Sequence, residues 1–313
     1  MTRAFVFPGQ GSQAVGMGRE LAEAFPVARQ LFQEVDDALS QKLSALMFEG
    51  PEDQLTLTEN AQPALMAMSM AVVRVLETEG KLDLAKAASF VAGHSLGEYS
   101  ALAAAGTFTV ADTARLLKIR GQAMQKAVPV GMGAMAALLG SELEQAREIA
   151  ALAAEGEVCE AANDNGGSQV VLSGHKGAVD RAIKIAAEKG IKRAIPLPVS
   201  APFHCALMQP AADAMAEALA KVEMKAPRVP LVANVTAARV TDPAAIRDLL
   251  VRQVTGTVRW RESVLFMKAE GVTSLVELGA GKVLGGLAKR IDKELSGSSV
   301  GTPADIEAFL KSL

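Results

Sequence analysis

The residues whose types and spacing most directly suggest chemistry form the segment G-H-S-L-G-E at 93–98. An apolar stretch precedes it and helix-forming residues follow, so the G-x-S-x-G pattern predicts a sharp turn from a strand into a helix. Glycines suit such a turn because they lack a Cβ atom. The turn would expose Ser95 Oγ and aim the Leu96 N–H at a developing oxyanion, which predicts covalent acyl chemistry. The alternative is a buried glycine-rich turn with no catalytic role.

A serine hydroxyl is a weak nucleophile that needs a base, and the chain has three histidines. His94 precedes the serine and should point elsewhere on the turn, while His175 is expected in a solvated loop. His204 lies where the chain returns from an expected insert to the main domain, so we predict that it is the base. No carboxylate between Ser95 and His204 stands out as a third member. This favours a dyad whose imidazole is oriented by a carbonyl oxygen.

A second glycine-rich segment, F-P-G-Q-G-S-Q at 7–13, directly follows the first expected strand. Strand ends gather at one edge of an open α/β sheet, so this segment could supply a second oxyanion donor beside the Leu96 N–H. Gln10, between two glycines, is the residue we expect to do so. The alternative is an ordinary strand-to-helix loop. A Walker-type phosphate loop is excluded because the Lys-Ser/Thr ending is missing.

Arg120 lies on the apolar face of the helix expected at 110–127. With Leu116 at zero, a 100° wheel puts Arg120 at about 40° and Met124 at about 80°. A buried guanidinium must find an anion, because an unpaired buried charge costs several kcal/mol. The helical geometry alone leaves two partners open: a core carboxylate, or the free carboxylate of a dicarboxylic half-thioester, which the planar guanidinium can bind through two hydrogen bonds.

Composition sets broad limits on the class of protein. Half of the 313 residues are hydrophobic, enough for a core in one large domain or in one domain with an insert. A formal net charge of −3 argues against binding of nucleic acid or of an anionic membrane. No stretch fits a signal peptide or a bilayer span, so a cytoplasmic protein is expected. Cys159 and Cys205 lack metal-type spacing, so neither a disulfide framework nor a metal site is expected.

The order of the expected elements indicates two units. Strand-like stretches alternate with helical patterns in the first and last thirds, which is typical of an α/β fold with a parallel sheet. The middle part has the βαββαβ order of a ferredoxin-like unit, and proline and glycine flank it. We therefore predict one α/β domain at 1–128 and 199–313 and an inserted subdomain at 129–198, with a cleft between them.

The expected strands lie at 4–7, 90–92, 134–139, 158–162, 169–173, 192–197, 229–232 and 274–277. The expected helices include 110–127, 142–154, 178–189 and 243–253, with others before 222, after Gly97, from Trp260 and after Gly281. Asn60-Ala61-Gln62-Pro63 is expected to open a long helix with the proline in its first turn. After Ser296 we expect a short polar turn and one last helix.

Taken together, the motifs resemble those of the bacterial malonyl-CoA:acyl carrier protein transacylases of type II fatty acid synthesis. The likeness extends over essentially the whole chain. The motifs that carry it are F-P-G-Q-G-S-Q at 7–13, G-H-S-L-G-E at 93–98, K-I-R-G-Q-A-M around Arg120, N-x-x-x-x-x-Q-V-V-L-S-G from Asn163, and F-H-C-A-L-M from Phe203. The resemblance implies a hydrolase-like α/β domain with a ferredoxin-like insert.

The resemblance also implies roles for individual residues. Ser95 would carry the malonyl group as an ester, with His204 as base and then acid. Arg120 would hold the malonyl carboxylate, while Gln10 and the Leu96 N–H would form the oxyanion hole. Further roles implied by the family are a histidine-orienting carbonyl at Gln253 and substrate contacts at Met124, Phe203 and Asn163, with Phe203 in the malonyl-selecting pattern.

The activity implied is ping-pong transfer from malonyl-CoA to the phosphopantetheine thiol of acyl carrier protein. No metal or cofactor is expected, since the coenzyme A thioester is a substrate, and the family expectation is a monomer. Other readings are a stand-alone acyltransferase of a polyketide pathway, a serine thioesterase or esterase, and a non-catalytic module that binds the carrier protein. Arg120 argues against a hydrolase for neutral acyl chains, which has no use for a buried cation.

Overall fold

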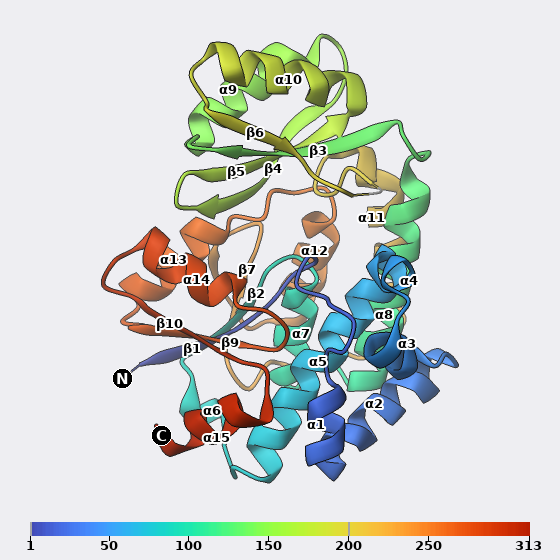
Figure 1. Ribbon diagram of the computed structural model, residues 1–313, viewed down its shortest axis with the longest axis vertical. Helices are drawn as coiled ribbons and strands as arrows, with labels where there is room; N and C mark the ends of the chain where they lie inside the picture. The colour runs from blue at the N-terminus through green and yellow to red at the C-terminus, as the bar shows by residue number, and fades with distance from the viewer. Residues whose placement is uncertain (1, 200) are drawn as a thin grey trace.

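The larger of two sheets is built from both ends of the chain. The computed structural model describes residues 2–199 and 201–313, so Met1 and Ser200 lie outside the described residues. Six strands follow the order β10–β9–β1–β2–β7–β8 (Figure 1), all parallel to their neighbours except β8. The expected mixed α/β class with a parallel sheet is confirmed. The strands are β1 (Arg3–Phe7), β2 (Phe90–Gly93), β7 (Leu231–Ala233), β8 (Ala238–Val240), β9 (Ser274–Leu278) and β10 (Ser296–Val300).

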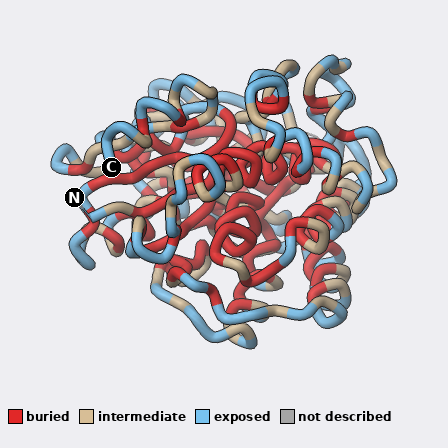
Figure 2. The backbone as a smooth tube through the Cα atoms, turned by 90° about the horizontal axis from the view of Figure 1, so that it is seen from below, coloured by how far each residue is buried: buried red, intermediate tan, exposed pale blue. Residues whose placement is uncertain are grey.

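Side chains of the central strands alternate between two cores. Phe5 and Phe7 belong to a large core on one face of the sheet, and Ala4 and Val6 to a second core on the other face. A strand that is buried on both faces is typical of a parallel sheet covered by helices. Figure 2 shows the buried residues running through the middle of the molecule with exposed segments around them.

Helices cover both faces of this sheet. Helices α5, α7 and α8 contribute to the first core, and α13 and α14 to the second. The helices of this part are α1 (Arg19–Ala24), α2 (Pro26–Leu39), α3 (Leu43–Glu49), α4 (Glu52–Thr56), α5 (Thr58–Thr78), α6 (Leu84–Ala87), α7 (Gly97–Ala104), α8 (Val110–Ala127), α11 (Gln209–Ala220), α12 (Pro243–Gln253), α13 (Trp260–Ala269), α14 (Val283–Ile291) and α15 (Pro303–Lys311).

The smaller sheet contains four antiparallel strands in the order β4–β5–β3–β6. It has its own core, which includes Ile149 and Leu172, and its helices lie on the side away from the larger sheet (Figure 1). On the near side, β4 meets the larger unit through a bridge between Asn163 and Val258. Its elements are β3 (Gly133–Leu139), α9 (Leu143–Ala154), β4 (Cys159–Gly166), β5 (Gln169–His175), α10 (Lys176–Glu188) and β6 (Arg193–Pro196).

Two strands differ from the expectation. The stretch after Ser296 is not a turn but the edge strand β10, and β8 was not expected at all. Strand β10 consists of Ser and Gly up to its last residue, and β8 is only three residues long, so neither carries a readable strand pattern. In β10, Gly297 is required for close packing, since a Cβ there would lie 2.0 Å from the Gly285 carbonyl oxygen.

Helix α5 begins earlier than expected. Pro63 lies in its interior, whereas the expectation put it in the first turn. The helix starts at Thr58, so only the N–H groups of its first four residues are free of the need for a helical partner. Pro63 is the sixth residue and therefore removes one hydrogen bond from the second turn.

Within residues 2–199 and 201–313, no helix has the length and apolar character needed to cross a membrane. Cys159 and Cys205 are both buried free thiols, in agreement with the expectation of small core residues. No group of three or more potential metal-binding side chains occurs in the described ranges.

Candidate active site

Ser95 sits at the tip of a tight turn from β2 into α7. Its φ of 54° is in the left-handed region, which costs an L-residue energy and is common at strained functional turns. The flanking glycines are sterically required. A Cβ at Gly93 would lie 1.9 Å from Gly97, and a Cβ at Gly97 would lie 2.2 Å from the Phe7 carbonyl oxygen. The sequence therefore folds here as the expected strand–turn–helix, packed against the end of β1.

His204 lies directly beside the serine. Its Nε2 is 2.7 Å from Ser95 Oγ, and its Nδ1 is 2.9 Å and 3.2 Å from the carbonyl oxygens of Gln253 and Gly256. Because carbonyl oxygens only accept, Nδ1 carries the proton and Nε2 presents its lone pair to the hydroxyl. Burial, and then the charge of Arg120, lower the pKa of His204 to about 3. The imidazole is therefore neutral at pH 7.

Arg120 reaches the same hydroxyl from α8, and its side chain is 1% exposed. Its Nη2 donates to Ser95 Oγ at 3.2 Å and to Gln253 Oε1 at 2.8 Å, and its Nη1 donates to Gln62 Oε1 at 2.8 Å. The guanidinium carbon lies 5.7 Å from the centre of the Tyr99 ring. These partners are all neutral. No carboxylate among the described residues forms an ion pair with Arg120, so a core carboxylate, one of the two partners left open by the helical geometry, is not found there.

Sequence reasoning missed Asn234, at the end of the β7 strand. Its Oδ1 accepts from the Ser95 N–H at 2.9 Å, and its Nδ2 donates to the Gly93 carbonyl at 2.7 Å. One amide therefore holds the backbone on both sides of the turn. Nothing in the sequence marks Asn234, because it follows a strand of only three residues.

Gln62 and Glu98 were also missed as site residues. Gln62 is buried on α5 and holds Arg120; its place before Pro63 was noted only as a helix start. Glu98 is part of the G-H-S-L-G-E motif, is 1% exposed, and accepts from Gln253 Nε2 at 2.7 Å. A carboxylate on an otherwise apolar helix is the signal that could have identified it.

The two residues expected to stabilise an oxyanion lie at neighbouring loops. A Cβ on Gly9 would lie 2.8 Å from the His94 carbonyl oxygen, so the loop of Gln10 packs against the serine turn. Gln10 Oε1 accepts from Thr58 Oγ1 at 2.9 Å, which orients that side chain. The Leu96 N–H donates no hydrogen bond to any described residue. It is therefore available for a substrate oxygen.

The remaining substrate-contact predictions meet different outcomes. Met124 is buried beside the Arg120 network, with its Sδ 3.7 Å from Gln62 Nε2, and Phe203 is a buried neighbour of His204. Asn163 is buried on β4 but makes no side-chain hydrogen bond to the other predicted site residues within the described ranges. It is Asn165, two residues later, whose Oδ1 lies 2.8 Å from His94 Nε2.

The other two histidines are occupied elsewhere. His94 lies between Asn165 and the Trp260 ring, 5.9 Å from that ring centre, and burial lowers its pKa. His175 is not in a solvated loop, as the sequence suggested. It ends β5, precedes α10, and its Nδ1 accepts from the Val158 N–H at 2.9 Å. A strand-to-helix junction is hard to distinguish from a loop when the helix follows without a gap.

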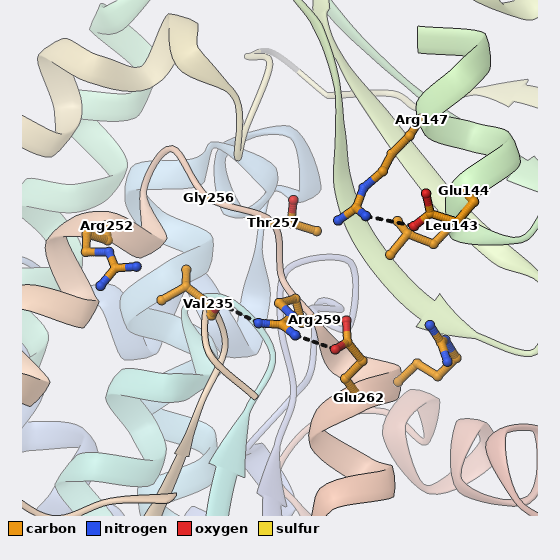
Figure 3. A pocket seen from close by; sticks show the side chains of 10 residues that line it. Leu143, Glu144, Arg147, Val235, Arg252, Gly256, Thr257, Arg259 and Glu262 are labelled. Carbon is orange, nitrogen blue, oxygen red and sulfur yellow. Dashed lines mark hydrogen bonds and ion pairs between the residues drawn. The ribbon is translucent and has the colours of Figure 1, made fainter. Parts of the chain in front are cut away.

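A pocket of about 530 Å³ is lined by residues of both units (Figure 3). Gly256 and four arginines are among the residues that line it, whereas Ser95 and Arg120 are not. The pocket is therefore distinct from the predicted acyl site. All four arginines form ion pairs with carboxylates: Arg147 with Glu144, Arg252 with Asp248, Arg259 with Glu262 and Arg261 with Asp164.

Known proteins include close relatives of this chain. Residues 4–292 match the model of the acyl transferase domain. The malonyl CoA-acyl carrier protein transacylase of Escherichia coli (strain K12) is 48% identical over 308 residues, covering 98% of each chain.

Two solved structures are also close. An acyl-carrier-protein-S-malonyltransferase from Bartonella henselae is 60% identical, with a TM-score of 0.97 over 100% of this chain and 99% of that one. The malonyl-transacylase PlMCAT, solved with the type II PKS acyl-carrier protein AntF, is 45% identical, with a TM-score of 0.96 over 100% of both chains. The chain belongs to the acyl transferase domain family, among the malonyl CoA-acyl carrier protein transacylases.

Proposed function

We propose that the protein transfers the malonyl group of malonyl-CoA to the phosphopantetheine thiol of acyl carrier protein through a Ser95 ester, for fatty acid synthesis. One observation carries this proposal. Ser95 Oγ has a neutral His204 Nε2 at 2.7 Å and the Arg120 guanidinium at 3.2 Å. A nucleophile, its base and a carboxylate-binding group thus meet at one atom, as transfer of an acidic acyl group requires.

In the first half-reaction, His204 Nε2 takes the hydroxyl proton as Ser95 Oγ attacks the thioester carbonyl. The Leu96 N–H and Gln10 stabilise the negative oxygen of the tetrahedral intermediate. The C–S bond then breaks, and the imidazolium returns its proton to the departing coenzyme A sulfur. The carbonyl oxygens of Gln253 and Gly256 hold the Nδ1–H throughout and so keep the correct tautomer.

In the second half-reaction, the phosphopantetheine thiol attacks the Ser95 ester and His204 takes the thiol proton. Collapse of the intermediate breaks the ester C–O bond and returns the proton to Ser95 Oγ. This restores the free enzyme and leaves the malonyl group on the carrier protein, which is ping-pong transfer. The chemistry requires no metal or cofactor, because the coenzyme A thioester supplies the activated acyl group.

Arg120 is suited to bind the malonyl carboxylate because its partners in the free protein are neutral. A carboxylate can replace the Ser95 hydroxyl as an acceptor of Nη2 while Gln62 and Gln253 keep their hydrogen bonds to the guanidinium, and no other charge is left unpaired. The incoming anion also offsets the guanidinium charge, the second cause of the lowered pKa of His204. Substrate binding thereby makes the base stronger when it is needed.

The finer description of the fold is part of the same proposal. A hydrolase-like catalytic domain comprises 1–128 and 199–313, and a ferredoxin-like subdomain comprises 129–198. The antiparallel order β4–β5–β3–β6 with two helices on one side supports the second name. We further propose that the protein acts as a cytoplasmic monomer and binds neither nucleic acid nor membrane.

A second candidate is the same transfer in a polyketide pathway. The structure of PlMCAT with a type II PKS acyl-carrier protein, at 45% identity, is the observation that favours it. The two candidates share the site and differ only in the carrier protein. Competition between a fatty acid carrier protein and a polyketide carrier protein for the malonylated enzyme distinguishes them.

The test is transfer to holo acyl carrier protein, followed by the mass of the carrier. We expect a malonyl adduct on the holo carrier with the natural enzyme, and none with Ser95→Ala or with a carrier that lacks phosphopantetheine. If malonyl-CoA is hydrolysed but the carrier gains no mass, the protein is a thioesterase instead. If the natural protein and Ser95→Ala bind the carrier equally well and neither transfers an acyl group, the protein is a non-catalytic module that binds the carrier.

A further inference from the structure

Glu98 is a buried acid without a role in the steps above. It lies on the first turn of α7, directly after the serine turn, and is 1% exposed. Its Oε2 accepts from Gln253 Nε2 at 2.7 Å and from the Asn234 N–H at 3.3 Å, while Oε1 has no partner. Burying a carboxylate with one oxygen that accepts no hydrogen bond costs folding free energy. This cost suggests that the hydrogen bonds to the other oxygen have a specific role.

The partner of Glu98 is the side chain that also holds Arg120. Gln253 Nε2 donates to Glu98 Oε2 and to the Ser95 carbonyl oxygen at 2.9 Å, while Gln253 Oε1 accepts from Arg120 Nη2 at 2.8 Å. If this amide flipped, its NH₂ group would face the guanidinium and its oxygen would face the carboxylate. Both contacts would then be repulsive. Asn234 Oδ1 also lies 3.2 Å from Nε2. These acceptors together set the direction of the Gln253 amide, and Glu98 supplies the shortest of the contacts.

We propose that Glu98 is a positioning residue for malonyl selectivity: it fixes the Gln253 amide, which in turn orients Arg120 over Ser95 Oγ before the substrate arrives. This inference depends on the proposed function. Orientation in advance matters because a guanidinium that must first be ordered binds a carboxylate less tightly. Glu98 acts through Gln253 and makes no hydrogen bond to Arg120.

The role requires an acceptor oxygen at a fixed distance from the α7 backbone, where Gln253 Nε2 can reach it. It does not require a charge. Burial raises the pKa of Glu98 to about 7, so both protonation states are populated near neutral pH. A proton on the unpartnered Oε1 leaves Oε2 able to accept. Glutamine at position 98 can present an oxygen at the same place, whereas aspartate retains the charge but is one methylene too short.

A matched control exists in the larger sheet. Glu277 on β9 is also fully buried, its Oε2 accepts from the Gly285 N–H at 2.9 Å and from Ser299 Oγ at 3.1 Å, and its Oε1 is likewise unpartnered. It contacts none of the residues that hold Arg120. Glu277→Asp therefore reports the general effect of shortening a buried acid.

The experiment measures the ratio of malonyl-CoA to acetyl-CoA loading rates by intact mass, for the natural protein, Glu98→Gln, Glu98→Asp and Glu277→Asp. We expect Glu98→Asp to lower the ratio on the order of tenfold, as for loss of one buried hydrogen bond to a charged group. The loss should appear as a raised KM for malonyl-CoA, with acetyl loading little changed. Glu98→Gln and Glu277→Asp should keep the natural ratio.

Each contrary result has a distinct meaning. An unchanged ratio in Glu98→Asp overturns the inference, and so does an equal loss in Glu277→Asp, which indicates a general packing effect. A loss in Glu98→Gln as large as in Glu98→Asp shows that charge is required, which also contradicts it. If the natural protein itself loads no malonyl group, the proposed function fails first and the inference fails with it.

Discussion

Arg120 Nη2 donates a hydrogen bond to Ser95 Oγ in the free protein, at 3.2 Å. A group suited to select the substrate and the nucleophile are therefore already in contact. Arg120 also contributes to the lowered pKa of His204, so one cation influences both the nucleophile and its base.

Replacement of Arg120 separates carboxylate binding from the rest of the chemistry. Arg120→Ala should slow loading from malonyl-CoA on the order of a hundredfold, since two hydrogen bonds to charged groups are lost. Acetyl loading should fall much less, and hydrolysis should rise relative to transfer because the ester is no longer fixed against water. The measurement is the adduct formation rate by intact mass. Arg115→Ala on the same helix, where Arg115 is half exposed and pairs with Asp112, is the control. Unchanged malonyl kinetics in Arg120→Ala would contradict the assignment.

The pH dependence of loading should lack an ordinary histidine step. His204 acts as a base when neutral, and its pKa is lowered to about 3 in the free protein. It therefore stays neutral as the pH falls through the usual range near 6.5, so kcat/KM for malonyl-CoA should not halve there. Stopped-flow loading between about pH 8 and pH 5 measures this, within the range of ordinary histidine titration. A clear loss of rate centred near pH 6.5 would show that His204 is protonated in the usual way.

The free energy of unfolding at acid pH should also depend on His204. The unfolded chain binds a proton at His204 below about pH 6.5, whereas the folded protein does not do so until about pH 3. Stability from this residue is thus present above the unfolded pKa and is lost as the pH falls toward the folded one. Urea unfolding at a series of pH values should give a smaller loss between these limits in His204→Ala than in the natural protein. Parallel curves for the two proteins would refute it.

Asn234 should be important for both stability and rate. It accepts from the Ser95 N–H and donates to the Gly93 carbonyl, so Asn234→Ala leaves two backbone groups without partners. We expect the free energy of unfolding to fall by about 2–4 kcal/mol and loading to slow, because the left-handed turn at Ser95 is no longer held. Urea denaturation and intact mass measure the two effects. Asn60→Ala, at another buried asparagine whose partners are Gln41, Gln54 and Lys118, is the control and should have the smaller effect on loading.

Gly97 should not tolerate a side chain. A Cβ there would lie 2.2 Å from the Phe7 carbonyl oxygen, a backbone atom that cannot move aside alone. Gly97→Ala should destabilise the protein by about 3 kcal/mol, the upper end of the usual cost of overpacking. Gly286→Ala is the matched control, since a Cβ on that helical glycine meets no atom within 4 Å and should be neutral or stabilising. Equal melting temperatures for the two variants would contradict the packing argument.

Much of the fold could be predicted where local signals are strong. Helices α8 and α12 have the expected bounds, because Thr109 and Asp242 cap their first turns and an apolar face continues along each. The edge strand β10 could not be predicted, since Ser and Gly carry little strand preference and its pairing partner β9 determines its structure.

The site was predictable to the extent that its residues lie in recognisable motifs. Ser95, His204 and Arg120 meet as the spacing and the helical face indicate. The contact of Asn234 with Ser95 spans 139 residues, and that of Gln62 with Arg120 spans 58. Such pairings depend on how strands and helices are placed in space, and a single sequence does not reveal them.

The most direct test of the account is the mass of the protein within seconds of mixing with malonyl-CoA, followed by location of the modified peptide. We predict one malonyl group per chain, attached to the peptide that contains Ser95 and absent from Ser95→Ala. Acetyl-CoA under the same conditions should give little adduct. A malonyl adduct that persists in Ser95→Ala, or a natural protein that gains no mass, would contradict the central claim that Ser95 carries the acyl group.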